Sequence, residues 1–423
     1  MKKFLAALCM VSLLLLSFVG CNKGDALVVW SFTDEVGNMI NNYYLKAFPD
    51  VKVRYAITIQ EQYENRLDPV LRAGRGAPDV IVMEAAFVRK YIESGELLDI
   101  TDIYERNKDK ILPYTVEVGT YNGRVYGLSW QATPGAFFYR RSFAQKYLGT
   151  DDPEVVQTYF SDVEKFIETA GLLHQRSDGK CVAVASRGDI FQFMFATREL
   201  PWVIDDLLHV DPNMGRYKDI AKMLYMNRWE GRVGQWSEGW FAGMQDSLRD
   251  ENGNLLEVFG YFLPTWGLHY VLKTNTPQTS GDWAMIPGPV PYRWGGTWIG
   301  AWRATDKPDE AKHLIEFLTT NDEFLTQWAL DTGDFVSNMK VVNSIKDNFS
   351  EPFLGGQNHY AAFAERAPYI DGSLLQGTDR GIEDYWHEAV TAYVLDEKTK
   401  EQALADFRAQ VLSIFGLESA PDL

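Results

Sequence analysis

The hydrophobic pattern of this chain alternates between short apolar runs and longer stretches with helical spacing. Residues 27–30 form an apolar run, and residues 51–57 alternate strictly between apolar and polar, as a half-buried strand does. Residues 79–83 form another buried run. Helical patterns follow these segments and extend to about Ala47, over about 61–73, and near 87–94. Strands that alternate with helices predict an α/β layer built on a largely parallel sheet.

The same alternation returns in the second half of the chain. Residues 283–287 and 298–302 are strand-like, and an acid-capped helix is expected from about Pro308 to Thr319. Long amphipathic stretches lie near 153–170, 217–228 and 398–414. The sequence contains no fixed-period repeat or low-complexity segment. We therefore expect an α/β protein whose second half is the more helical.

The first twenty residues have the three parts of a secretory signal. Lys2 and Lys3 precede an apolar stretch over residues 4–16, which ends in small residues before Cys21. The apolar stretch is too short to span a bilayer comfortably. A cysteine directly after Gly20 resembles the bacterial lipobox, in which that cysteine becomes the acylated N-terminus. We predict a signal peptide over 1–20, a polar tether over 21–25, and an exported protein held at the cell membrane or in the periplasm by lipid on Cys21. The alternative is an ordinary signal peptide whose cysteine is incidental.

Composition narrows the class of partner. Removal of the signal and lipidation of Cys21 leave Cys181 as the sole free cysteine, so no intrachain disulfide is expected and Cys181 is predicted to be a buried hydrophobe. The formal net charge of −17 argues against nucleic acid or an anionic membrane surface as a partner. The histidines show no metal-ligand spacing and no phosphate-binding loop is present, so no metal or cofactor is expected. Several of the 13 tryptophans stand beside Gly, Pro or Ser, where burial alone does not require them.

Six short blocks occur in an order typical of one protein family. They are residues 27–31 (LVVWS), 74–80 (GRGAPDV), 121–130 (YNGRVYGLSW), 137–141 (FFYRR), 281–289 (GDWAMIPGP) and 295–298 (GGTW). Together they resemble the bacterial ABC-transporter extracellular solute-binding proteins of family 1, the group that includes maltose-binding protein. The resemblance runs from about Ala26 to the C-terminus. Ser129 replaces the family's usual proline, and Arg140 and Arg141 replace Asn-Lys, so the identity of the ligand stays open.

The resemblance implies a periplasmic-binding-protein-like fold. Two discontinuous α/β lobes, 26–131 plus 284–330 and 132–283 plus 331–423, would be joined by crossover hinge segments with the ligand cleft between them. It implies a monomeric receptor that captures a carbohydrate and passes it to the transmembrane subunits of an ABC permease, touching the membrane through its lipid anchor alone. Two alternatives stay open, a surface-anchored carbohydrate-active enzyme and a sensor that uses the same fold.

Four tryptophans and one glutamine are the candidate stacking and crossover residues. Trp266 lies where the family often has an aromatic platform, since an indole face binds the apolar C–H face of a sugar; the alternative is a core tryptophan under a loop. Trp298 follows a glycine pair and is equally consistent with site or core. Trp130 and Gln131 fall at the presumed first crossover and should face the cleft, whereas Trp30 is ranked lower because it belongs to a core strand.

Charged residues at strand ends are the other candidates. Asp34 and Glu35 follow the first strand, Glu84 follows the third, and Arg187 and Asp189 follow a strand in the other lobe. Open α/β sheets bind ligands beyond the carboxyl ends of their strands, so these side chains could contact sugar hydroxyls. Helix capping alone would also explain Asp34 and Glu35. Nothing in the sequence pairs two carboxylates as glycoside hydrolysis requires, so catalysis is not expected. The i, i+4 spacing of Trp236 and Trp240 indicates one packed helix face.

Overall fold

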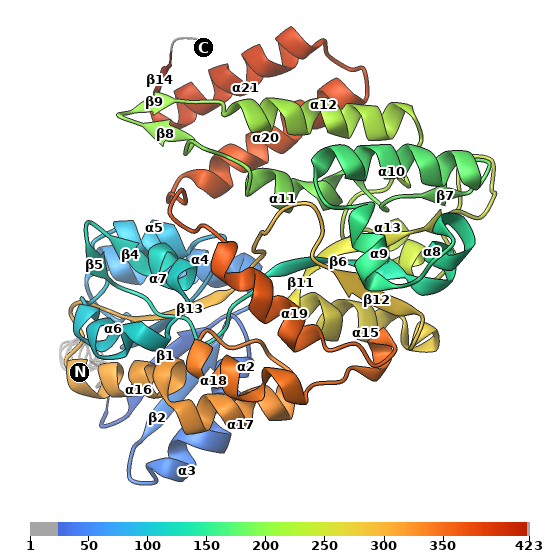
Figure 1. Cartoon of the computed structure of the whole chain (residues 1–423). Coiled ribbons are helices and arrows are strands. Elements are labelled where there is room, and N and C mark those ends of the chain that lie inside the picture. The colour runs from blue at the N-terminus through green and yellow to red at the C-terminus, as the bar shows by residue number, and fades with distance from the viewer. Residues whose placement is uncertain (1–23, 421–423) are drawn as a thin grey trace, which may run out of the picture.

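Two α/β lobes and a helical layer make up the part of the chain that the computed structural model describes, residues 24–420. In Figure 1 the first lobe lies at the lower left, the second at the right, and the helical layer above them. The signal peptide and Cys21 lie outside the described residues. Within 24–420, no helix is both long and apolar enough to cross a membrane.

The first lobe is built on a four-stranded sheet in the order β13-β3-β1-β2. Its strands are β1 (Leu27–Ser31), β2 (Val53–Ile57), β3 (Val80–Glu84) and β13 (Thr297–Ala301). β1 pairs in parallel with β2 and β3, and β13 runs antiparallel to β3. The parallel α/β layer predicted for this part of the chain is confirmed. Helix α4 (Gln60–Ala73) ends where Gly74 takes a left-handed φ of 62°, as the glycine-rich stop signal indicated.

Further helices of the first lobe pack around this sheet. They are α2 (Glu35–Met39), α3 (Leu45–Ala47), α5 (Val88–Glu93), α6 (Thr101–Asn107), α7 (Pro113–Gly119), α16 (Pro308–Thr320), α17 (Asp322–Thr332) and α18 (Met339–Ile345). The buried side chains of β3 pack against α4 and α5 through residues such as Leu67 and Ile92.

The second lobe is built on a sheet in which all pairings of the central strand are antiparallel. β6 (Gly135–Arg140) lies between β11 (Gly260–Pro264) and β12 (Trp283–Ile286). β7 (Cys181–Val182) pairs in parallel with β10 (Glu257–Val258), which leads into β11. Its helices include α8 (Arg141–Leu148), α9 (Pro153–Thr158), α10 (Val163–Arg176), α11 (Phe191–Phe195), α13 (Glu238–Met244), α15 (Lys273–Asn275) and α19 (His359–Arg366). Cys181 is fully buried, and burial raises the pKa of its thiol, so its structural role is confirmed.

The helical layer consists of α12 (Pro212–Met226), α20 (Asp379–Val394) and α21 (Lys400–Phe415). Helix α20 packs on both of the others, and Figure 1 shows the three helices together above the lobes. Three two-residue strands, β8 (Val203–Ile204), β9 (Leu207–Leu208) and β14 (Glu418–Ser419), form a small sheet at one end. Trp386 and Phe407 join this layer to the core of the second lobe.

Three segments run side by side between the two main sheets. Isolated bridges pair Leu128 with Ile299, Gln131 with Val336, and Pro134 with Arg293. The crossover segments that the fold class required are therefore present. The lobe boundary drawn at residue 284 is wrong by one strand, because β12 pairs with β6 and places Ala284 opposite Tyr139. The boundary drawn at residue 330 is also wrong, because α18 packs against α17 in the first lobe. The chain returns to the first sheet after Ile286, between β12 and β13.

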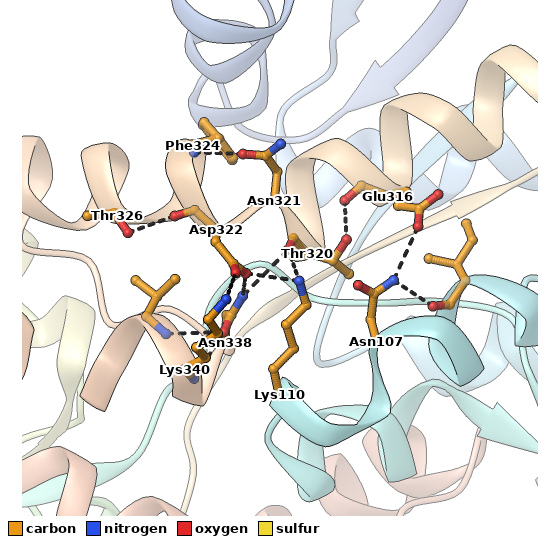
Figure 2. A network of polar contacts seen from close by, with 12 residues as sticks. Asn107, Lys110, Glu316, Thr320, Asn321, Asp322, Phe324, Thr326, Asn338 and Lys340 are labelled. Atoms are coloured by element: carbon orange, nitrogen blue, oxygen red, sulfur yellow. Dashed lines mark hydrogen bonds and ion pairs between the residues drawn. The ribbon is translucent and has the colours of Figure 1, made fainter. Parts of the chain in front are cut away.

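A polar network fixes one of these crossing segments to the first lobe. Figure 2 shows the side chains of Lys110, Asn338 and Lys340 pointing at the carboxylate of Asp322. Lys110 Nζ lies 2.9 Å and Asn338 Nδ2 2.8 Å from Asp322 Oδ1, and Lys340 Nζ lies 2.6 Å from Oδ2. Hydrogen bonds from these donors lower the pKa of Asp322 to about 2, against the raising effect of its burial. The network holds the end of the crossing at Asn338, where α17 and α18 meet.

Candidate functional site

Trp266 is part of a partly exposed aromatic cluster. It lies in the short helix α14 (Thr265–Gly267) at the carboxyl end of β11, and its indole is half-buried. Its Nε1 donates to the carbonyl oxygen of Trp294 at 3.0 Å, and the two rings meet edge to face with centroids 5.7 Å apart. The ring of Trp236 stacks on that of Trp266 at 6.2 Å and an interplanar angle of 15°, and it also meets the ring of Trp294 edge to face at 5.6 Å. Trp266 thus lies on an aromatic wall, hereafter the Trp236–Trp266–Trp294 wall.

Trp236 was misassigned from the sequence. It precedes helix α13 and has a left-handed φ of 65°, a strained conformation for a bulky residue. Its side chain is 44% exposed, whereas Trp240 is fully buried. The interpretation of the two as one packed helix face is therefore wrong, since the helix begins at Glu238 with Ser237 as its N-cap. The signal that could have identified the loop was Gly234 before Trp236 and the capping serine after it.

Asp189 supports this wall from beneath and does not face the cleft. Its carboxylate accepts hydrogen bonds from Trp240 Nε1 at 2.8 Å, Gln235 Nε2 at 3.1 Å and the Ser186 backbone N–H at 3.0 Å. Burial raises its pKa to about 7. Because it is 1% exposed, the predicted ligand contact is corrected to a structural role. It anchors the loop that carries Trp236.

Arg187 is the neighbour of this buried acid and remains partly accessible. Its guanidinium lies 3.8 Å from the buried Glu230 carboxylate and packs over the ring of Tyr225. Both of these contacts are made within the protein, so the guanidinium already has partners. We therefore place Arg187 at the margin of the site.

Carboxylates of the first lobe face an aromatic residue of the second. Asp34 and Glu35 begin helix α2 directly after β1; Asp34 is exposed and Glu35 is half-buried. Burial, followed by Asp334 and Asp34, raises the pKa of Glu35 well above its ordinary value. Tyr270 stands at i, i+4 spacing from Trp266, and its pKa is raised by desolvation and by the nearby Glu35 and Asp334 carboxylates. The Glu35 and Asp334 carboxylates thus lie near Tyr270, an exposed aromatic residue four positions after Trp266.

A cavity of about 330 Å³ continues the cleft beyond Trp294. Glu84 and Arg89 line it from the first lobe, and Arg198, Trp294 and Glu383 line it from the second lobe and the helical layer. Glu84 ends β3, and one of its oxygens accepts the Ala86 backbone N–H at 2.7 Å. Burial raises the pKa of this carboxylate. The structure thus brings Glu84 to the cleft, at the strand end where the sequence placed it.

Three crossover candidates are buried and lie outside the site. Trp298 is 1% exposed and donates from Nε1 to the Thr115 carbonyl at 2.7 Å. Trp130 is fully buried and donates to Asp334 Oδ2 at 3.1 Å. Gln131 donates from Nε2 to the Thr297 hydroxyl at 2.9 Å. The expectation that Trp130 and Gln131 face the cleft is wrong, because the crossing segments pack against one another and bury them. Of the two alternatives open for Trp298, the structure supports the core one.

Trp30 lies at the edge of the first lobe's core, as its place in a core strand predicted. Its backbone carbonyl accepts a hydrogen bond from the Tyr63 hydroxyl at 2.9 Å, and the guanidinium of Arg66 lies 3.9 Å above its ring. The indole packs against the core of the first lobe, so the stacking face that a sugar would need is covered by protein.

Known proteins similar to this chain agree with this architecture. The model of a family described as bacterial extracellular solute-binding protein matches residues 39–351. The arabinooligosaccharide-binding protein of Bacillus subtilis (strain 168) is 24% identical over 431 residues, which cover 92% of this chain and 91% of that protein.

Solved structures match over the same extent. A structure of an extracellular solute-binding protein of family 1 superposes with a TM-score of 0.81 at 19% identity, covering 92% of this chain and 99% of that one. The galacto-N-biose/lacto-N-biose I-binding protein of the Bifidobacterium longum ABC transporter, in complex with lacto-N-biose, has a TM-score of 0.71 at 16% identity, covering 94% and 100%. The predicted two-lobe fold is confirmed.

Proposed function

This chain belongs to the bacterial extracellular solute-binding protein family, and from that premise we propose that it binds an oligosaccharide between its lobes and delivers it to an ABC permease. Membership makes the chain an exported solute-binding protein. The carbohydrate class of the ligand is supported by the names of similar proteins, which bind arabinooligosaccharide and lacto-N-biose.

The observation that carries the proposal is the nearly parallel pair of Trp236 and Trp266. Two indoles from separate segments offer an apolar surface beside the cleft, and one of them is 44% exposed. Such a surface suits the C–H face of a pyranose or furanose ring. Glu35 and Glu84 lie on the opposing lobe and can accept hydrogen bonds from the hydroxyls of that ring.

Hinge closure is the proposed mechanism. A ligand held by the aromatic wall of one lobe and the carboxylates of the other binds the closed form better than the open form, and shifts the population by that difference. The three crossing segments are the elements about which the lobes would move.

We also propose that the protein acts as a monomer tethered by lipid on Cys21. A tether keeps the receptor near the membrane and raises its effective concentration at a permease. The motif that supports this anchor is the charged and apolar leader that ends at Gly20.

Titration of the purified protein with a panel of solutes tests the proposal. The panel holds neutral oligosaccharides (arabinotriose, galactobiose, lacto-N-biose, maltotriose), an amino acid mixture and a polyamine, with heat and tryptophan fluorescence as readouts. We expect saturable binding of at least one oligosaccharide, with a change in indole emission from the wall. Binding of an amino acid or polyamine, with no response to any sugar, would contradict the carbohydrate assignment.

A further inference from the structure

Five of the charged side chains that line the cavity beyond Trp294 form a row of three carboxylates and two guanidinium groups. The row consists of Glu84 from β3, Arg293 on a crossing segment, Glu383 and Asp379 on α20, and Arg198 just after α11. Burial lowers the pKa of Arg293, and the carboxylates of Glu84, Glu383 and Asp379 oppose that effect because they lie nearby. The row thus joins the first lobe to the helical layer.

The far end of this row is unsatisfied. The side chains of Arg198 and Asp379 are 2% and 6% exposed, and their closest nitrogen and oxygen are 3.6 Å apart. Among residues 24–420, Arg198 Nε and Nη1 and both carboxylate oxygens of Asp379 have no hydrogen-bond partner. The Arg198 guanidinium is held in place over the ring of Phe195, 3.5 Å from its centroid. Buried charges without hydrogen bonds are costly, so this corner is built to receive polar atoms from elsewhere.

The charges at this corner, where Arg198 and Asp379 lie, decide which chemical class of ligand it can bind. Burial, and after it the nearby Asp379, raises the pKa of Glu383, and Arg198 and Arg293 lie near both carboxyl groups. Arg89, Lys90 and Arg380 line the same cavity, so both signs of charge are present and neither an anion nor a cation meets a lining of opposite charge alone. A hydroxyl donates to Asp379 and accepts from Arg198 at the same time, and two neighbouring hydroxyls of one sugar ring can satisfy both groups.

The corner and the aromatic wall are parts of one continuous surface. Trp294 lines the cavity and also contacts Trp266, both ring to ring and through the Nε1 hydrogen bond. A ligand unit stacked on the Trp236–Trp266–Trp294 wall can therefore extend past Trp294 toward Arg198 and Asp379. The cavity volume of about 330 Å³ is sufficient for one monosaccharide unit.

We propose that Arg198 and Asp379 form an end subsite that binds two neighbouring hydroxyls of an uncharged terminal sugar, and that this subsite selects neutral oligosaccharides over those ending in a uronic acid. This inference rests on the proposed function and adds the charge class of the ligand and the residues that select it. Removal of either side chain removes the donor or the acceptor that a terminal ring needs.

Calorimetric titration of four proteins tests the inference: the wild type, Asp379→Asn, Arg198→Lys and the control Asp347→Asn. Asp347 is exposed and is not part of the cavity lining. The probes are arabinotriose, galactobiose, lacto-N-biose, maltotriose and trigalacturonate. We expect the wild type to bind a neutral probe and not trigalacturonate. Asp379→Asn and Arg198→Lys should each weaken the neutral probe about tenfold or more, and Asp347→Asn by less than about twofold. Thermal unfolding of each variant confirms that it is folded, and two substitutions keep the test open if one variant does not fold.

Three results would overturn the inference. If both variants are folded and bind the neutral probe like the wild type, the corner is not a subsite, although the proposed function stands. If the wild type prefers trigalacturonate, the charge selectivity is wrong while the oligosaccharide assignment survives. If the wild type binds none of the sugars, the proposed function fails and the inference fails with it.

Discussion

Trp236 and Trp266 stack with their ring centroids 6.2 Å apart and their planes 15° from parallel. One comes from a strained loop before α13 and the other from the helix start after β11. Neither element alone would hold an exposed indole in a fixed orientation. The pair does so because Asp189 anchors the first loop through Gln235 and Trp240, and Trp294 accepts the hydrogen bond of Trp266. The stack is a preorganised surface.

Replacement of Trp266 by alanine should weaken oligosaccharide binding about tenfold or more, since a tenfold loss corresponds to about 1.4 kcal/mol, the scale of a lost aromatic contact. Trp236→Ala should have a similar effect. Isothermal titration with the tightest probe is the measurement. Tyr369→Ala is the control, because Tyr369 is 73% exposed and stands apart from the wall. Equal affinities of the wild type and both tryptophan variants would remove the wall from the site.

Trp298→Ala should lower the stability of the protein and leave its sugar affinity unchanged, in contrast to the substitutions in the wall. Its indole is buried in the core of the first lobe and bonded to Thr115, so its removal leaves a cavity and breaks that hydrogen bond. We expect a loss of about 3–5 kcal/mol in the free energy of unfolding. The folded fraction should retain its sugar affinity. Urea denaturation gives the first quantity and titration of the folded protein the second; a large loss of affinity with unchanged stability would return Trp298 to the site.

Asp322→Asn should destabilise the protein in a pH-dependent way. The folded-state pKa is lowered to about 2 from an ordinary value of 3.8, so the contribution of the carboxylate is present above about pH 4 and is lost as the pH falls toward 2. Because the side chain is about one-third exposed (33%), we expect only about 1 kcal/mol at neutral pH. Unfolding midpoints of the two proteins should converge on acidification. Asp347→Asn, at an exposed position in the same lobe, should show no such convergence.

Cys21→Ser tests the anchor without touching the cleft. The variant should lose fatty-acid labelling and appear in the soluble fraction, because the acylated side chain is absent. It should bind the same oligosaccharide with the wild-type affinity. Ser17→Ala, in the same leader, is the matched control and should remain labelled. Continued membrane association of Cys21→Ser would contradict lipid attachment at this residue.

The sequence predicted the first lobe better than the second. Strict alternation over 51–57 and the buried run over 79–83 correspond to β2 and β3. β3 is buried along its first four residues, whereas β2 is partly buried and its Ile57 is 49% exposed. The antiparallel pairing of β12 with β6 joins segments far apart in the chain, and no local pattern encodes it. The boundary at residue 284 was misplaced for that reason.

Site residues could be predicted where a strand ends, and not where segments cross. Glu84 and Trp266 follow buried strands, so the topology alone carries them to the cleft. Trp130 is buried by other crossing segments and Trp298 by the core of the first lobe, and a single sequence does not reveal these contacts. Trp236 was missed because i, i+4 spacing with Trp240 is typical of a helix, whereas its positive φ is visible only in the folded chain.

The crystal structure of the complex with the tightest-binding oligosaccharide tests the central claim most directly. The account predicts one sugar ring in van der Waals contact with the Trp236–Trp266–Trp294 wall, hydroxyls directed at Glu35 or Glu84, and the ligand enclosed by both lobes. Ligand density away from the cleft, or a cleft ligand that leaves the indoles of the wall facing solvent, would contradict it.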